Sequence, residues 1–178
     1  MNELDLITSF WGKWLIIPGF FFGFIGVIYI ILYQSKFEKH KDKKKTGLVL
    51  IGVFVFVWGV GYSLFFVMDY LALKEIQSLL NEPNIVLKIN NKKLDGDFFK
   101  NVKNQLILID NYQGHNSHPT EKIEIKIESQ NKSITLRLHQ DSEIKKEFWV
   151  FLNDYNYTRQ NNIGKIQTSI FKKYFEDS

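Results

Sequence analysis

Long apolar stretches mark the N-terminal part of the chain. Two of them, Trp14 to Tyr33 and Leu48 to Met68, contain no charged residue and are 20 and 21 residues long. About 20 apolar residues are needed to cross the ~30 Å hydrocarbon core of a bilayer. We therefore predict two transmembrane helices. A cleaved signal peptide fits less well, because the first stretch is longer than a typical signal core and follows Glu3 and Asp5.

Shorter patterns mark the rest of the chain. Residues 69–82 have apolar positions at helical spacing and are predicted as a helical stalk that ends at Pro83. Beyond it, alternating apolar and polar positions indicate strands. The predicted elements are a strand at 85–90, a helix at 96–104 capped by Asp95, and strands at 105–110, 122–129, 133–139 and 147–152. A C-terminal amphipathic helix is predicted by apolar residues at helical spacing, namely Ile163, Ile166, Ile170 and Tyr174.

These elements predict an α+β membrane protein with two domains. Residues 1–82 are expected to form a two-helix transmembrane anchor with a short basic loop at 34–47 and the stalk described above. Residues 83–178 are expected to form a soluble β-rich domain, either a small antiparallel sheet or a partly closed barrel, covered by the C-terminal helix. The two strands that flank the polar link at 130–132 are expected to pair as an antiparallel hairpin.

Lysines predict the orientation of the spans. The loop between them contains Lys36, Lys39, Lys41, Lys43, Lys44 and Lys45. The N-terminal tail contains only Lys13, and Lys74 is the only basic residue between the second span and Lys88. Cytoplasmic loops carry the excess of basic residues, so we predict a cytoplasmic loop and both termini outside. The Lys, Asn and Ile content is typical of bacteria, which predicts an inner-membrane protein with a periplasmic domain.

Composition excludes several kinds of chemistry. The chain has no cysteine, which excludes disulfides, thiolate nucleophiles and Cys-ligated metal centres. The net charge of +4 is spread thinly over both halves, so no nucleic-acid binding is expected. The sequence contains no glycine-rich phosphate loop and no catalytic-triad motif. We therefore predict that the protein is not an enzyme and needs no cofactor.

Glycines in the predicted spans indicate close helix packing. Gly19, Gly23 and Gly26 follow one another at spacings of four and three, and Gly52 and Gly59 share a face at a spacing of seven. Two interpretations are open, namely packing of the two helices against each other and a homo-oligomer formed through these faces. Neither span contains an ionisable residue, which argues against a proton or ion pathway.

An aromatic segment is the candidate binding site of the soluble domain. The strand at 147–152 has large apolar side chains on both faces, so it is either a central strand under a helix or a partner-binding surface. Trp, Tyr and Arg concentrate binding energy in interfaces. The candidate binding residues are Trp149, Phe151, Tyr155, Tyr157 and Arg159.

A histidine pair is the only candidate metal site. His115 and His118 lie three apart in a polar loop and could ligate a metal together with Asp110 or His139. The simpler interpretation is a solvated loop with incidental histidines, because no spacing defines a third ligand. No metal is therefore assigned.

The leading functional hypothesis is a non-enzymatic binding module, anchored in the bilayer, whose periplasmic domain binds a protein or envelope partner, for instance as an immunity-type or accessory protein. The plan of two N-terminal spans followed by a β-rich domain also resembles the two-transmembrane β-barrel effectors of bacterial cyclic-oligonucleotide antiphage systems. That resemblance implies a barrel that binds a cyclic nucleotide and helices that assemble to disrupt the membrane. A cytosolic messenger requires a cytoplasmic domain, whereas the lysines predict the opposite side, so the effector is the alternative.

Overall fold

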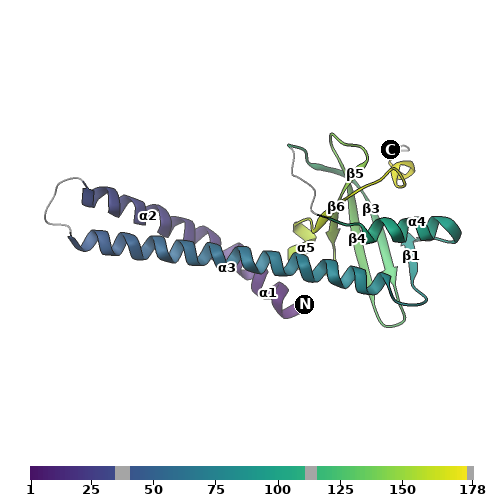
Figure 1. Ribbon diagram of the computed structural model, residues 1–178, viewed down its shortest axis with the longest axis horizontal. Coiled ribbons are helices and arrows are strands. Elements are labelled where there is room, and N and C mark those ends of the chain that lie inside the picture. The colour runs from purple at the N-terminus through teal and green to yellow at the C-terminus, as the bar shows by residue number, and fades with distance from the viewer. Residues whose placement is uncertain (35–40, 111–115, 176–178) are drawn as a thin grey trace. The chain divides into compact units, whose positions relative to one another are not determined.

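The computed structural model describes residues 1–34, 41–110 and 116–175 (Figure 1). The chain divides into two units, Met1–Met68 and Asp69–Ser178. It is an α+β protein with two long apolar helices and one six-stranded antiparallel sheet, so the predicted fold class is confirmed at this level.

The first unit consists of helices. The stretch Asn2–Gln34 comprises α1 (Asn2–Phe10), the π-helix η1 (Trp11–Leu15) and α2 (Ile16–Gln34), and α3 (Lys41–Leu80) follows. Both helical stretches are long and apolar enough to cross a membrane, and only 17% and 6% of their most apolar windows are buried. A core helix of a soluble protein would be mostly buried. The outward apolar side chains are suited to lipid, and membrane insertion itself stays a prediction.

The glycines of α2 lie against α3. A Cβ atom added at Gly23 would lie 2.7 Å from the ring of Phe54, and one at Gly26 would lie 2.9 Å from the backbone oxygen of Gly47. Gly19 is similarly close to α3, at 2.9 Å from a methyl group of Val57. Because the missing side chains let the two backbones approach, these glycines are part of the packing between α2 and α3.

The glycines singled out in the second span are not part of this packing. Apart from the neighbouring backbone of α3 itself, no heavy atom of the described residues lies within 4 Å of a Cβ atom added at Gly52 or Gly59. The close contact on this part of α3 is made by Gly61, where an added Cβ would lie 3.1 Å from the Trp11 ring. The Trp11 indole also donates a hydrogen bond of 3.0 Å to the Val57 carbonyl. The face of Gly52 and Gly59 is therefore open, and a homo-oligomer through it stays a prediction.

The second unit is built on an open sheet with the strand order β2-β1-β3-β4-β5-β6, in which all neighbours are antiparallel. The strands are β1 (Val86–Ile89), β2 (Lys92–Lys93), β3 (Pro119–Glu128), β4 (Ser133–Asp141), β5 (Glu147–Leu152) and β6 (Gly164–Gln167). The remaining elements are α4 (Gly96–Ile107), α5 (Asn156–Gln160) and the 3-10 helix η3 (Lys172–Tyr174). The predicted hairpin is confirmed as β3 and β4, whereas the barrel alternative is wrong because β2 and β6 remain edges.

One face of the sheet forms the core. In β3, Ile123, Ile125 and Ile127 are at most 1% exposed, as their alternation with charged residues predicts. The other buried sheet residues are Leu87, Ile89, Ile134, Leu136, Leu138, Phe148, Val150 and Leu152. The opposite face carries the polar and charged residues of β3 and β4, together with Trp149 and Phe151 of β5. In Figure 1 the last turns of α3 and the helix α4 lie over the strands.

The segment predicted as a stalk is part of this core. Ala72, Ile76 and Leu80 of α3 are completely buried and lie at spacings of four. The Glu75 carboxylate accepts a hydrogen bond of 2.9 Å from the Tyr155 hydroxyl and forms an ion pair with Lys132. Because these contacts tie the end of α3 to the β3–β4 turn and to the segment after β5, residues 69–80 belong to the soluble unit and not to a free stalk.

The strand predicted at 105–110 is wrong. Its first residues are the last turn of α4, which extends beyond the predicted 96–104. Val102, Leu106 and Ile109 are at most 7% exposed, whereas Leu108 is 58% exposed. This is helical spacing, which the unbroken apolar run at 106–109 concealed. Asp95 occupies the N-cap position of α4, but its side chain makes no capping hydrogen bond.

The predicted C-terminal amphipathic helix is also wrong. Residues 164–167 form β6, and up to residue 175, where the described part of the chain ends, the only helix that follows is the short η3. Gly164 has a φ of +155°, and a Cβ atom there would lie 2.8 Å from Ile109. A glycine disfavours a helix interior, and pairing with β5 satisfies the backbone of this segment instead. The role expected of the C-terminal helix, covering the sheet, is taken by α3 and α4.

Candidate functional site

On the polar face of the sheet, which is the face opposite the core, aromatic and basic side chains lie next to one another where β4 pairs with β5. His139 lies opposite Trp149, and Arg137 lies opposite Phe151. The rings of His139 and Phe151 meet edge to face with centroids 5.1 Å apart, and the Arg137 guanidinium lies 5.7 Å from the centre of the Phe151 ring. Arg137 also donates a hydrogen bond to the Arg159 carbonyl. We call Arg137, His139, Trp149 and Phe151 the aromatic cluster.

Asp141 at the end of β4 fixes one side of the aromatic cluster. Its carboxylate accepts hydrogen bonds from the Trp149 indole at 2.7 Å and the Ser117 hydroxyl at 2.5 Å. It also accepts two backbone hydrogen bonds of 2.9 Å, from Glu143 and Ile144. Burial alone would raise the pKa of Asp141, but these hydrogen bonds to the charged form outweigh it and hold the pKa well below its usual range.

A buried ion pair fixes the other side. The Lys165 ammonium lies 2.6 Å from a Glu147 carboxylate oxygen, and the two side chains are 5% and 1% exposed. The same ammonium lies 4.2 Å from the centre of the Trp149 ring, and Gln167 donates to the second Glu147 oxygen at 3.1 Å. The Trp149 ring is therefore held between a cation on one side and a carboxylate hydrogen bond on the other.

The five predicted binding residues fall into two groups. Trp149 and Phe151 lie in the aromatic cluster, and Arg159 contributes its carbonyl to it. Tyr155 is 7% exposed and bonds to Glu75 of α3. Burial and the nearby Asp69 carboxylate raise the pKa of Tyr157. Because Glu75 and Asp69 both belong to α3, the two tyrosines lie at that helix and not in the aromatic cluster.

Sequence reasoning missed the charged residues that hold the cluster. Asp141, Glu147 and Lys165 are buried, and charged groups are seldom buried unless they are paired. The sequence did indicate that two of these charges are buried, because Glu147 begins an otherwise apolar strand and Lys165 lies between Gly164 and Ile166. Their pairing depends on the contact between β5 and β6, which the helical interpretation of residues 163–174 excluded.

The histidine hypothesis gains no support from the described residues. They contain no group of three or more His, Asp or Glu side chains that could hold a metal ion. The His139 ring nitrogen Nδ1 lies 2.9 Å from the Thr120 carbonyl, and Asp110 forms a backbone bridge with Lys165. His118 lies next to β3, whereas His115 lies outside the described residues, so the pair itself stays a prediction.

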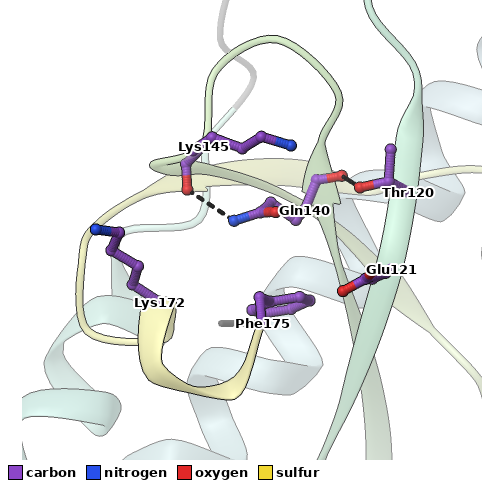
Figure 2. Close-up of a pocket in the computed structure, with 6 residues that line it drawn as sticks. All are labelled: Thr120, Glu121, Gln140, Lys145, Lys172 and Phe175. Carbon is purple, nitrogen blue, oxygen red and sulfur yellow. Dashed lines mark hydrogen bonds between the residues drawn. The ribbon is translucent and has the colours of Figure 1, made fainter. Parts of the chain in front are cut away.

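A pocket of about 400 Å³ lies where β3 begins and β4 ends, beside η3. Its lining residues are Thr120, Glu121, Gln140, Lys145, Lys172 and Phe175 (Figure 2). The side-chain amide of Gln140 donates a hydrogen bond of 3.1 Å to the backbone carbonyl of Lys145. The Thr120 hydroxyl donates a hydrogen bond of 2.7 Å to the backbone carbonyl of Gln140. The wall between β3 and the β4–β5 turn is thus held by hydrogen bonds.

Comparison of the chain with protein-family models, curated proteins and solved structures gave no match. The function is therefore inferred from the chemistry of its own residues.

Proposed function

We propose that the protein is a membrane-anchored, extracytoplasmic binding module that is not an enzyme and that contacts a protein or envelope partner through the polar face of its sheet. The observation that supports this most is the aromatic cluster. An arginine stacked on a ring loses little freedom when it binds, and Trp and Arg dominate the energetics of interfaces. Asp141 and the Glu147–Lys165 pair order the cluster before a partner arrives, which lowers the cost of association.

The charges around the cluster favour a protein partner over nucleic acid. On the same face, Lys88 and Lys126 lie 2.7 Å from Glu128, and Lys122 lies 3.4 Å from Glu124. Positively and negatively charged side chains therefore alternate across β1 and β3, whereas a nucleic-acid-binding surface concentrates positive charge. These side chains are 25 to 51% exposed, so the β1 and β3 part of the face is open to solvent, whereas Phe151 in the aromatic cluster is 9% exposed.

Site-specific photocrosslinking tests the proposed surface. The crosslinker p-benzoylphenylalanine is placed at Lys126, on the polar face, and at Lys100, which is 74% exposed on α4, in the full chain in its native host. We expect a discrete adduct from position 126 only, reduced by Arg137→Gln because the stacked guanidinium is lost. Equal adducts from both positions, no adduct from position 126, or an adduct that survives Arg137→Gln would contradict the proposed surface.

A second candidate function is a ligand-sensing effector whose spans oligomerise. Two observations favour it, namely the open face of Gly52 and Gly59 and the continuity of α3 into the core of the soluble unit. A ligand that altered this core would act on the same helix that carries the open glycine face. The two functions differ in the side of the membrane on which the soluble unit lies.

Thiol labelling of intact cells distinguishes these functions. The chain has no native cysteine, so single cysteines at Gln130 in the β3–β4 turn and at Lys45 in the first turns of α3 can be probed separately. We expect a membrane-impermeant maleimide that reaches the periplasm to label position 130 in intact cells and position 45 only after lysis, because the lysines favour a cytoplasmic loop. The reverse pattern would overturn the extracytoplasmic module and support the effector.

A further inference from the structure

The pocket beside η3 has an ordered wall and an aromatic side. Gln140 is 8% exposed and is fixed by its hydrogen bond to the Lys145 carbonyl. The Phe175 ring lies 5.4 Å from the ring of Phe148, a fully buried residue of β5, so the aromatic side rests on the core. A volume of about 400 Å³ lies within the range of small-molecule sites, roughly 300–1,000 Å³.

Opposite charges line different parts of this pocket. In Figure 2 the Glu121 carboxylate points from β3 toward Phe175, whereas Lys145 lies on the β4–β5 turn at the other end of the opening. Lys172 also lines the pocket, but its ammonium points away from the other labelled residues. Within the part of the chain that the structure describes, the side-chain charges of Glu121 and Lys145 have no partner.

A ligand with one charge would satisfy only one end of such a site. A simple anion would be attracted by Lys145 but repelled by Glu121. A simple cation would be attracted by Glu121 but repelled by Lys145. A molecule with both an ammonium and a carboxylate group can pair with both residues, while its apolar part lies on Phe175. The arrangement therefore discriminates against singly charged ligands.

We propose that this pocket binds a small zwitterion with an apolar side chain, of the size of an amino acid. Glu121 binds its ammonium group, Lys145 binds its carboxylate, and Phe175 contacts the side chain. The Gln140 side-chain oxygen and the Thr120 hydroxyl add polar contacts at the fixed wall. This site is separate from the aromatic cluster, so the proposal does not depend on the proposed partner.

Three matched probes test the proposal on the full chain in lipid nanodiscs, with empty nanodiscs as the reference. L-Phenylalanine carries both charges, 3-phenylpropanoate lacks the ammonium group, and phenethylamine lacks the carboxylate. Binding is measured by ligand-observed NMR titration. We expect L-phenylalanine to bind about tenfold more tightly than either singly charged probe, because each lost pair leaves a charge of the site unmatched.

Charge-neutral variants identify the two ends of the site. Glu121→Gln is expected to remove the preference for L-phenylalanine over 3-phenylpropanoate, and Lys145→Gln the preference over phenethylamine. Both residues are exposed, so the fold tolerates the changes. Asp97→Asn and Lys100→Gln, both exposed on α4, are the controls and should leave the three affinities unchanged. Absence of L-phenylalanine binding, equal affinity for a singly charged probe, or insensitivity to both pocket variants would overturn the proposal.

Discussion

Replacing Lys165 with methionine is expected to destabilise the soluble unit by about 3 to 5 kcal/mol, because breaking a buried ion pair from one side leaves an uncompensated charge. Glu147, only 1% exposed, would keep the hydrogen bond from Gln167 but lose the ammonium at 2.6 Å. The measurement is urea unfolding of the full chain in mild detergent. Pulse proteolysis at each urea concentration reports the folded fraction of the soluble unit.

The double variant is the control for this pair. Glu147→Gln with Lys165→Met removes both charges together, so it should recover much of the stability that Lys165→Met loses, because replacing both partners of a buried pair is often close to neutral. If Lys165→Met alone costs less than about 1 kcal/mol, the value typical of an exposed pair, then the pair does not hold β6 to β5.

Asp141→Asn is expected to destabilise the soluble unit by about 3 kcal/mol, because each buried donor left without an acceptor costs roughly 1–3 kcal/mol. Both carboxylate oxygens accept hydrogen bonds, one from Trp149 and Ser117 and the other from two backbone amides. An asparagine amide group would place a donor against one of these sets. The exposed Asp97, changed to Asn, is the matched control and should stay within about 0.5 kcal/mol of the parent.

The effect of Asp141→Asn should depend on pH. Because the pKa of Asp141 is held below its unfolded value of about 3.9, its contribution to stability is complete above about pH 5 and decreases as the pH falls toward the folded pKa. Asparagine does not titrate, so the difference between parent and variant should be largest at pH 7 and smaller at pH 3. An undiminished difference at pH 3 would show that the hydrogen bonds do not favour the charged form.

Several features of the fold could be predicted because they depend on neighbouring residues in the chain. The two apolar stretches have a length and composition that a helix can use to cross a bilayer, and the structure has both helices. The alternation in Ile123, Ile125 and Ile127 indicated which side of β3 is buried, and the polar link after it indicated the hairpin with β4. In these cases the local pattern and the tertiary environment agree.

The site was predicted only in part, since strands place residues side by side according to their pairing. Trp149 and Phe151 were found from their type, but Arg137 and His139 join them because β4 pairs with β5 in one particular register. Tyr155 was assigned to the same site by proximity in sequence. It instead bonds to Glu75, 80 residues earlier in the chain.

The sequence by itself determined the two apolar helices, four of the six strands (β1, β3, β4 and β5) and the buried side of β1, β3 and β4, because periodicity encodes which side of an element avoids water. Only the tertiary structure decided what covers that side. The end of α3 and α4 cover the sheet, and residues 164–167 pair with β5, since Gly164 disfavours a helix and the Glu147–Lys165 pair needs that contact. Local patterns contain no information about contacts between residues 18 or 80 positions apart.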